Sequence, residues 1–239
     1  MDTRGVQVDA LHPTGTVAVS LEEGQPAYHI VPRQAYDFIV LSKVEDATRH
    51  TEIALLYHGS LAIRHDHSRH TLQGLCEQFD VPRCIDINLR APWWHRETVL
   101  NALNGAYCVK LNDEELMELI SPDAILEGDL QNAAERFHEH YDLQVLIVTR
   151  GARGALMITP DGVLAGAPVA VETVMDTVGA GDAFSAVVLL GLLRGWAWTD
   201  ILDRALAFAA RICTVRGATI KEKGVYAAFL DTWVGDSGG

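Results

Sequence analysis

The chain has 239 residues, of which 49% are hydrophobic and 21% charged, enough for one substantial core or for a large domain with a small appendage. The 19 Lys and Arg against 32 Asp and Glu give a net charge of −13, which argues against non-specific binding to nucleic acid or an anionic membrane. No apolar run approaches the roughly 18 residues of a membrane span, and residues 1–15 lack a signal-peptide apolar region, so we expect a cytoplasmic protein.

The four cysteines are scattered without a CxxC pair, which suits reduced thiols in the interior of a cytosolic protein. Histidines cluster at residues 65–70 and at His138 and His140, a spacing that invites a zinc interpretation. Since no helical HExxH pattern is present, we favour solvated helix faces for these histidines.

The first predicted elements form a hairpin. Residues 16–21 and 28–31 alternate between apolar and polar side chains, and residues 22–26 supply a turn with Gly24. Two strands alone do not make a stable domain, so this hairpin is expected to belong to a small sheet that flanks or covers the main body.

From residue 36 onward, short apolar runs alternate with longer helical patterns. This alternation predicts an α/β fold with a mostly parallel sheet flanked by helices on both faces. The predicted strands and helices are, in chain order, strands at residues 38–41, 53–58, 83–87, 107–111 and 145–149, and helices at 68–79, 96–104, 113–120 and 130–141.

The last third is predicted to be a hairpin followed by helices. Residues 154–163 contain the turn signal Pro-Asp-Gly at 160–162. Residues 182–193 are apolar almost all round, which predicts a deeply buried helix, and residues 199–215 form a more amphipathic helix. Residues 235–239 read as a frayed tail.

Polar residues follow four of the predicted strands, at 59–60, 86–90, 112–115 and 149–151. Ligands of open α/β sheets bind at the carboxyl ends of the strands, so these sets predict a polar cleft. The segment DTVGAGDAF at 176–184 is the strongest of all. Its Gly-Ala-Gly lies directly before a long apolar helix, where backbone N–H groups and the helix N-terminus form an anion site.

Asp182 lies at the mouth of this anion site, where a carboxylate can accept a proton from a hydroxyl that attacks a phosphoryl group. Asp182 could equally be a helix cap, with Gly179 and Gly181 making only the turn. A dinucleotide loop is a weaker alternative, because GxGxxG should follow the first strand of a βαβ unit and the third glycine is absent here.

Residues 176–184 resemble the DTxGAGD signature of ribokinase-like (PfkB) carbohydrate kinases, with every fixed position matched. Three more motifs agree in order: DxNxR at 86–90, NxxE at 112–115 and T-x-G-x-x-G at 149–154. The resemblance covers roughly residues 14 to 230. It implies a ribokinase-like fold, with a partial β-hairpin lid at residues 1–35 and an α/β nucleotide-binding kinase core at residues 36–239.

The resemblance also implies roles for single residues. Asp182 would be the catalytic base, with Gly179, Ala180 and Gly181 as the anion hole, and the cofactors would be Mg²⁺ with ATP, and K⁺. The residues implied to bind ATP are Asn112, Thr149, Arg150, Gly151, Gly154, Ala210 and Cys213. Those implied for the substrate or a phosphate are Asn88 and Arg90, and those for metals are Glu115 (Mg²⁺, indirectly) and Asp176 (a monovalent cation).

Each of the weaker assignments has a structural alternative. Asn112 and Glu115 could simply begin a helix with acidic residues in its first turn. Arg90, before Ala91 and Pro92, could be a surface turn residue. Small apolar helix residues such as Ala210 usually belong to the core.

Residues 12–17, 24–28 and 88–94 are similar to bacterial fructokinases of this family, so phosphorylation of fructose to fructose 6-phosphate is the first expectation. By the same resemblance, the hairpin could form a homodimer interface. The family's N-terminal Gly-Gly-x-x-x-Asn region has no counterpart before Thr14, and the chain reads as starting at the lid. The alternative function is therefore an N-terminally truncated, inactive relative that binds nucleotide without turnover.

Overall fold

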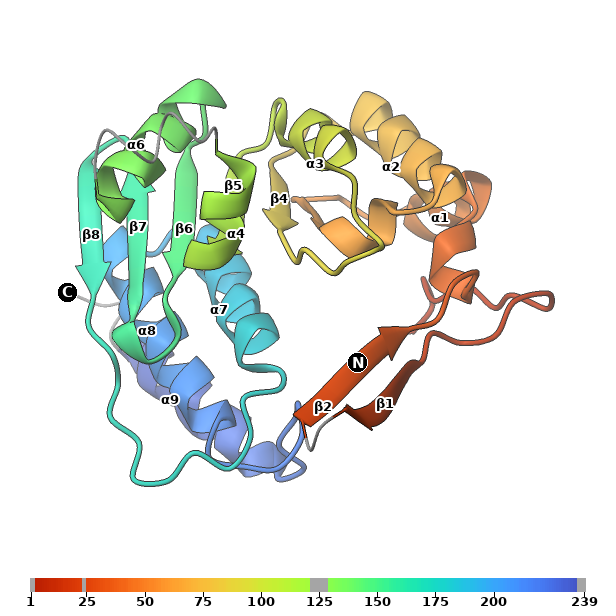
Figure 1. Ribbon diagram of the computed structural model, residues 1–239. Coiled ribbons are helices and arrows are strands. Elements are labelled where there is room, and N and C mark those ends of the chain that lie inside the picture. The colour runs from red at the N-terminus through yellow and green to blue at the C-terminus, as the bar shows by residue number, and fades with distance from the viewer. Residues whose placement is uncertain (1–2, 23–24, 121–128, 236–239) are drawn as a thin grey trace. The chain divides into compact units, whose positions relative to one another are not determined.

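The computed structural model describes residues 3–22, 25–120 and 129–235. The chain divides into two compact units, Met1–Val109 and Lys110–Gly239, whose elements are drawn in Figure 1. One two-stranded sheet, β1-β2, and one six-stranded sheet with the order β3-β4-β5-β6-β7-β8 are present in the described part. None of the helices in these ranges is both long and apolar enough to cross a membrane.

The first unit begins with the predicted hairpin. Strands β1 (Val17–Glu22) and β2 (Gln25–Ile30) pair antiparallel, from Val17 opposite Ile30 to Glu22 opposite Gln25. The strand predicted at 38–41 is wrong: a 3-10 helix η1 (Ala35–Phe38) and helix α1 (Leu41–Thr48) occupy this stretch. The Asp37 carboxylate accepts from the backbone N–H of Gln34 at 3.0 Å, a contact that stabilises the first turn of a helix.

The remainder of this unit is a parallel βαβ arrangement. Strand β3 (Leu56–Gly59) pairs with β4 (Arg83–Asp86), with Leu56 opposite Arg83. The 3-10 helix η2 (Ser60–Ile63) and helix α2 (Asp66–Gln78) connect these strands, and α3 (Arg96–Leu103) follows β4. Side chains of β4, α3 and η2 supply the core here, including Ile85, Val99 and Ile63.

The second unit continues the alternation and then becomes helical. Strand β5 (Cys108–Asn112), which contains the unit boundary, leads to α4 (Asp113–Leu119), α6 (Leu130–His140), β6 (Val145–Thr149) and η3 (Gly151–Arg153). Strands β7 (Ala155–Thr159) and β8 (Gly162–Gly166) extend β6 antiparallel. Helices α7 (Ala180–Arg194), α8 (Trp198–Ile212) and α9 (Lys223–Gly235) complete the chain.

Strand β6 is the centre of this unit's core, since the four residues from Val145 to Val148 are fully buried. A strand buried on both faces reads as a continuous apolar run, which is why its predicted bounds agree with the structure. The apolar helix predicted at 182–193 is α7, which packs against α8. Helix α9 had no counterpart in the sequence-based prediction, and residues 236–239 of the predicted tail lie outside the described residues.

Candidate active site

The glycine turn before α7 requires glycine for two reasons. Gly179 is the N-cap of α7 and has φ 82°, a left-handed conformation that is costly for other residues. A Cβ at Gly179 would also lie 2.6 Å from the Cα of Ala218, closer than real Cβ atoms approach. The loop at Ala218 therefore closes directly over the glycine turn.

The first turn of α7 presents backbone donors. The N–H of Ala180 donates to the carbonyl of Thr177 at 3.3 Å, which completes the turn. The N–H groups of Gly181 and Asp182 lie in the first helical turn, where no carbonyl of the same helix can accept from them. The Asp182 side chain is exposed, so this carboxylate is accessible to a substrate beside the positive end of the helix.

Asp176 fastens the loop that precedes this turn. Its Oδ1 accepts from the N–H of Val178 at 3.0 Å and its Oδ2 from the N–H of Gly217 at 2.9 Å. These hydrogen bonds hold the pKa of the Asp176 carboxyl below its ordinary value, so it stays ionised. The contact with Val178 closes a turn within the DTVGAGD segment, and the contact with Gly217 ties this segment to the loop that follows α8.

A cavity of about 580 Å³ opens beside the glycine turn, within the second unit. Its walls come from the β6–β7 turn, the loop after β8, the start of α7 and the last turns of α8. Its lining includes the following predicted residues: Thr149, Gly151, Gly154, Ala180, Gly181, Ala210 and Cys213. The structure thus brings part of the predicted anion site and most of the predicted nucleotide-binding residues to one cavity. The predicted residues that do not line it are Gly179, Asp182, Asn112 and Arg150.

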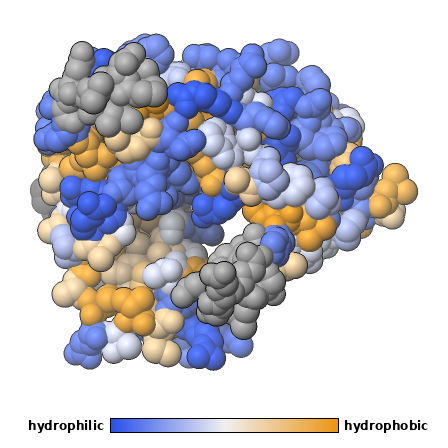
Figure 2. All heavy atoms as spheres, viewed as in Figure 1, coloured by the Kyte–Doolittle hydropathy of each residue, from blue (hydrophilic) through white to orange (hydrophobic). Residues whose placement is uncertain are grey.

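The loop after β8 gives this cavity an apolar wall. Pro168, Val169, Val171 and Val174 line the cavity, and Val169 and Val174 are 44% and 56% exposed. Figure 2 shows apolar side chains gathered on the surface over this loop. Exposed apolar side chains around a cavity indicate a binding surface for a weakly polar group.

The β6–β7 turn has two glycines with positive φ, Gly151 at 56° and Gly154 at 81°. A Cβ at Gly154 would overlap the carbonyl oxygen of Gly166, so this turn lies directly on the end of β8. The N–H of Arg150 donates to the Gly154 carbonyl at 2.8 Å. Arg153, for which the sequence motif predicts no role, forms an ion pair with Asp113 at the start of α4.

Asn112 and Glu115 form a capping box at the start of α4. The Asn112 Oδ1 accepts from the N–H of Glu115 at 2.7 Å, and the Glu115 Oε2 accepts from the N–H of Asn112 at 2.9 Å. Glu115 is only 8% exposed. The structural alternative for this motif, a capped helix start, is therefore present in the structure.

Lys110 is a site residue that sequence reasoning missed. A Cβ at Gly181 would lie 3.5 Å from the Lys110 Nζ, which places an ammonium group beside the first turn of α7. Lys110 is on β5, two residues before Asn112. The only sequence signal was one basic residue in the otherwise apolar run CVKL.

Asn88 and Arg90 belong to the first unit. The Asn88 backbone is fixed by Ser60: its N–H donates to the Ser60 Oγ at 2.8 Å, and the Ser60 hydroxyl donates to the Asn88 carbonyl at 3.0 Å. Arg90 is exposed and donates to the neighbouring Leu89 carbonyl at 3.4 Å. The peptide bond between Ala91 and Pro92 is cis.

Residues 1–223 match the family described as pfkB family carbohydrate kinase. The chain belongs to this family. It is 30% identical over 236 residues to the fructokinase of Escherichia coli, covering 90% of this chain and 74% of that protein. Over 203 residues it is 27% identical to an uncharacterized sugar kinase of Pyrococcus horikoshii, covering 81% of this chain but only 60% of that protein.

The fold comparison agrees with the family comparison. A fructokinase double mutant from Vibrio cholerae O395, solved with fructose, ADP and potassium ion bound, superposes with a TM-score of 0.72 at 26% identity. The superposition covers 93% of this chain and 74% of that one. The predicted ribokinase-like α/β fold of this pfkB chain, and its resemblance to fructokinases, are confirmed.

Proposed function

We propose that this pfkB chain uses ATP to phosphorylate a hydroxyl group of a sugar, with Asp182 as the general base. The observation that supports this most is the cavity of the second unit. Residues from three separate segments, predicted from sequence to bind nucleotide or anion, line this one cavity of about 580 Å³. That size lies within the range of typical small-molecule sites.

The two ends of the cavity suit the two ends of a nucleotide. Val169, Val174, Ala210 and Cys213 offer an apolar surface for the adenine ring. The phosphates would lie at the first turn of α7, where backbone N–H groups and the helix dipole favour negative charge. Lys110 adds a cation at this end, which matters in a chain whose net charge is −13.

In the proposed reaction, the Asp182 carboxylate accepts the proton of the attacking sugar hydroxyl. The hydroxyl oxygen then forms a bond to the γ-phosphorus of ATP, while the bond from that phosphorus to the bridging oxygen of ADP breaks. Charge that develops on the transferring group is stabilised by the donors of the glycine turn. The product is a sugar phosphate, and Asp182 later releases its proton.

Residues that would serve the metal ions are present. Mg²⁺ prefers carboxylate and amide oxygens and keeps several waters, so the capped Asn112 and Glu115 fit a role through water. Mg²⁺ would neutralise the phosphate charge. For K⁺, carbonyl oxygens of the loop fastened by Asp176 are the available ligands in our proposal.

The substrate that we propose is a furanose, with fructose as the first candidate and fructose 6-phosphate as its product. Two observations support this choice of substrate: fructokinases are among the relatives, and the first unit has the lid-like hairpin β1-β2. Asn88 and Arg90 are proposed to contact the sugar or a phosphate. A homodimer through the hairpin is a further proposal from the family resemblance.

Isothermal titration calorimetry with ATP, together with ADP release in the presence of Mg²⁺ and a sugar panel, tests the function. Asp182→Asn should leave ATP affinity within about twofold and lower sugar-dependent turnover by about 100-fold or more, the usual worth of a general base. Asp203→Asn is the matched control, because Asp203 is an exposed carboxylate of α8 outside the cavity.

Two other outcomes would decide against the proposal. ATP binding without turnover for any sugar would favour the alternative, an inactive relative that only binds nucleotide. Turnover that is unchanged in Asp182→Asn would exclude Asp182 as the base while leaving the kinase reaction in place.

A further inference from the structure

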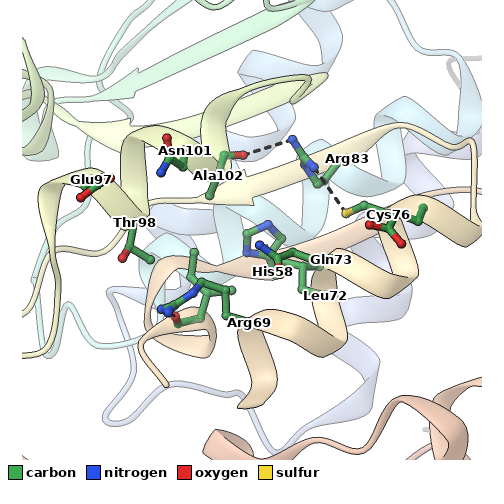
Figure 3. Close-up of a pocket in the computed structure, with 12 residues that line it drawn as sticks. His58, Arg69, Leu72, Gln73, Cys76, Arg83, Glu97, Thr98, Asn101 and Ala102 are labelled. Carbon is green, nitrogen blue, oxygen red and sulfur yellow. Dashed lines mark hydrogen bonds between the residues drawn. The ribbon is translucent and has the colours of Figure 1, made fainter. Parts of the chain in front are cut away.

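A second cavity, of about 520 Å³, lies within the first unit between α2 and α3. Figure 3 shows His58 and Arg83, from β3 and β4, together with side chains of the two helices around it. None of the candidate site residues from the sequence lines this cavity. It is therefore separate from the proposed catalytic machinery.

His58 brings a buried acceptor to this cavity. The residue is 8% exposed, and its Nδ1 lies 3.3 Å from the carbonyl oxygen of Gly59. Only a protonated Nδ1 can make that contact, so Nε2 carries a lone pair. Burial, aided by the charge of Arg83, lowers the pKa of His58 to about 4, and the ring is neutral at pH 7. Nε2 is buried and has no hydrogen-bond partner among the described residues.

Arg83 brings a donor to the same cavity. Its guanidinium is held in place by Nη1 donating to the Cys76 Sγ at 3.4 Å and by Nη2 donating to the Ala102 carbonyl at 3.1 Å and to the Asn104 carbonyl. Its Nε–H is buried and, among the described residues, has no acceptor. The side chains of His58 and Arg83 thus line one cavity, and each has a buried polar atom without a partner among the described residues, which calls for a hydrogen-bonding group there.

The charges around the cavity balance. Arg69 and Arg83 are matched by Glu77 and Glu97, and the remaining polar lining residues are the uncharged Gln73, Thr98 and Asn101. A cationic ligand would meet the arginines, and an anionic one the glutamates and the His58 lone pair. Among the described residues no group of three or more His, Cys, Asp or Glu is placed to hold a metal.

A hydroxyl group fits this pattern, since it donates one hydrogen bond and accepts two. One hydroxyl could donate to the His58 Nε2, and another hydroxyl of the same molecule could accept from the Arg83 Nε–H. We propose that this cavity is a second, non-catalytic binding site for a small neutral polyhydroxylated molecule, a sugar or a sugar alcohol. Leu72 and Ile63 supply an apolar wall for its carbon skeleton, and the exposed side chains of Gln73 and Glu77 move aside to admit it.

The test uses the full chain labelled with ¹⁵N-histidine and follows the Nε2 resonance of His58, assigned by its loss in His58→Phe. The chain is titrated with D-fructose and, separately, with D-sorbitol. At least one of these two molecules should shift the His58 resonance in a saturable manner. His138 on α6 is an internal control, because its Nε2 is also buried without a partner among the described residues but lies in the other unit. Its resonance should not move.

Further variants separate this site from the proposed catalytic site. Asp182→Asn should retain the His58 shift even if the chain proves to have no kinase activity. Thr98→Val, which removes a rim hydroxyl, should weaken the binding about fivefold, the worth of one hydrogen bond. A His58 resonance that neither polyol moves would overturn the proposal, and so would a stronger response to glucosamine or glycerate, which carry charge.

Discussion

Burial of His58 also makes the stability of the fold depend on pH. The pKa of His58 is lowered from 6.5 to about 4, first because burial removes its solvation and also because Arg83 is close. When pH falls below 6.5, the unfolded chain takes up a proton at His58 and the folded chain does not. Stability from this group is therefore present above pH 6.5 and is lost as pH falls toward 4.

We expect chemical denaturation at pH 7, 6 and 5 to show this loss. A pKa shift of one unit corresponds to about 1.4 kcal/mol. The stability lost through His58 between pH 6.5 and pH 4 is therefore up to about 3 kcal/mol. His58→Phe should flatten the pH dependence over this range, whereas His70→Gln, a change at an exposed position of α2, should leave it unaltered. If the free energy of unfolding changes with pH equally in His58→Phe and in the unaltered chain, other groups cause the acid instability.

Helix α7 carries a glycine with positive φ at each end, and only one of them is crowded. Gly179, the N-cap, would place a Cβ 2.6 Å from the Ala218 Cα, whereas Gly195, the C-cap with φ 65°, has nothing within 4 Å of its Cβ position. This pair separates the cost of the left-handed conformation from the cost of a collision.

Gly195→Ala should destabilise the protein by about 1–2 kcal/mol, the cost of a left-handed conformation for an L-residue. Gly179→Ala should cost more, and in the proposed function it should also weaken ATP binding, because the loop at Ala218 must move away from the glycine turn. Urea denaturation measures the loss of stability, and calorimetry with ATP measures the loss of ATP affinity. Equal losses of stability in both variants would mean that the loop at Ala218 moves away from the added methyl group at no cost in free energy.

A buried ion pair between Arg64 and Asp37 helps to attach the hairpin to its unit. Arg64, after η2, donates to both carboxylate oxygens of Asp37 at 2.7 Å and to the Val31 carbonyl at 2.8 Å. Its guanidinium lies 4.9 Å from the ring centroids of both Tyr36 and Trp93. Arg64 thus joins the segment that leaves β2 to the loop after β4.

Arg64→Met should destabilise the chain by about 3–5 kcal/mol, because it leaves the Asp37 carboxylate buried without its charge partner. Arg64→Met combined with Asp37→Asn should recover part of this loss. The control is Arg49→Met, since the Arg49–Asp46 pair is about two-thirds exposed and is worth less than about 1 kcal/mol. Thermal unfolding of the variants measures these losses of stability. If Arg64→Met loses no more stability than the control, a structural role for Arg64 is contradicted.

Elements with a strong local signal were predicted well, and those that depend on distant contacts were not. Strand β6 is a buried apolar run, and the bounds predicted for it agree with the structure. Residues 38–41 are equally apolar, but the contact from Asp37 to the Gln34 backbone favours helix there. Helix α9 has no capping residue that could be recognised in the sequence. It is stabilised by the packing of Trp233 and Phe229 against Phe208 of α8.

The candidate site shows the same division. Glycines and acidic residues in a fixed motif could be found from sequence, because turn chemistry demands particular residues at particular spacings. Lys110 could not, because its place beside Gly181 arises only when β5 and α7 pack in the same unit. His58 and Arg83 are single polar residues at strand positions, and only the packing of α2 and α3 shows that they share a cavity.

At the scale of the whole molecule, the net charge of −13 opposes the approach of ATP. The Debye length falls from about 30 Å at 0.01 M salt to about 8 Å at 0.15 M, so added salt screens the distant acidic residues more than the local donors at α7. In the proposed function, the association rate of ATP measured by stopped flow should therefore rise over this range. A falling rate would mean that Lys110 and nearby cations dominate the approach.

The contact between Arg64 and Trp93 has a practical consequence. Indole emission responds to a charge held close to the ring, so Trp93 is a native optical reporter placed at the joint between the hairpin and its unit. In a variant that keeps Trp93 and replaces the other four tryptophans, ligand-driven movement of that joint can be followed in real time without an attached dye.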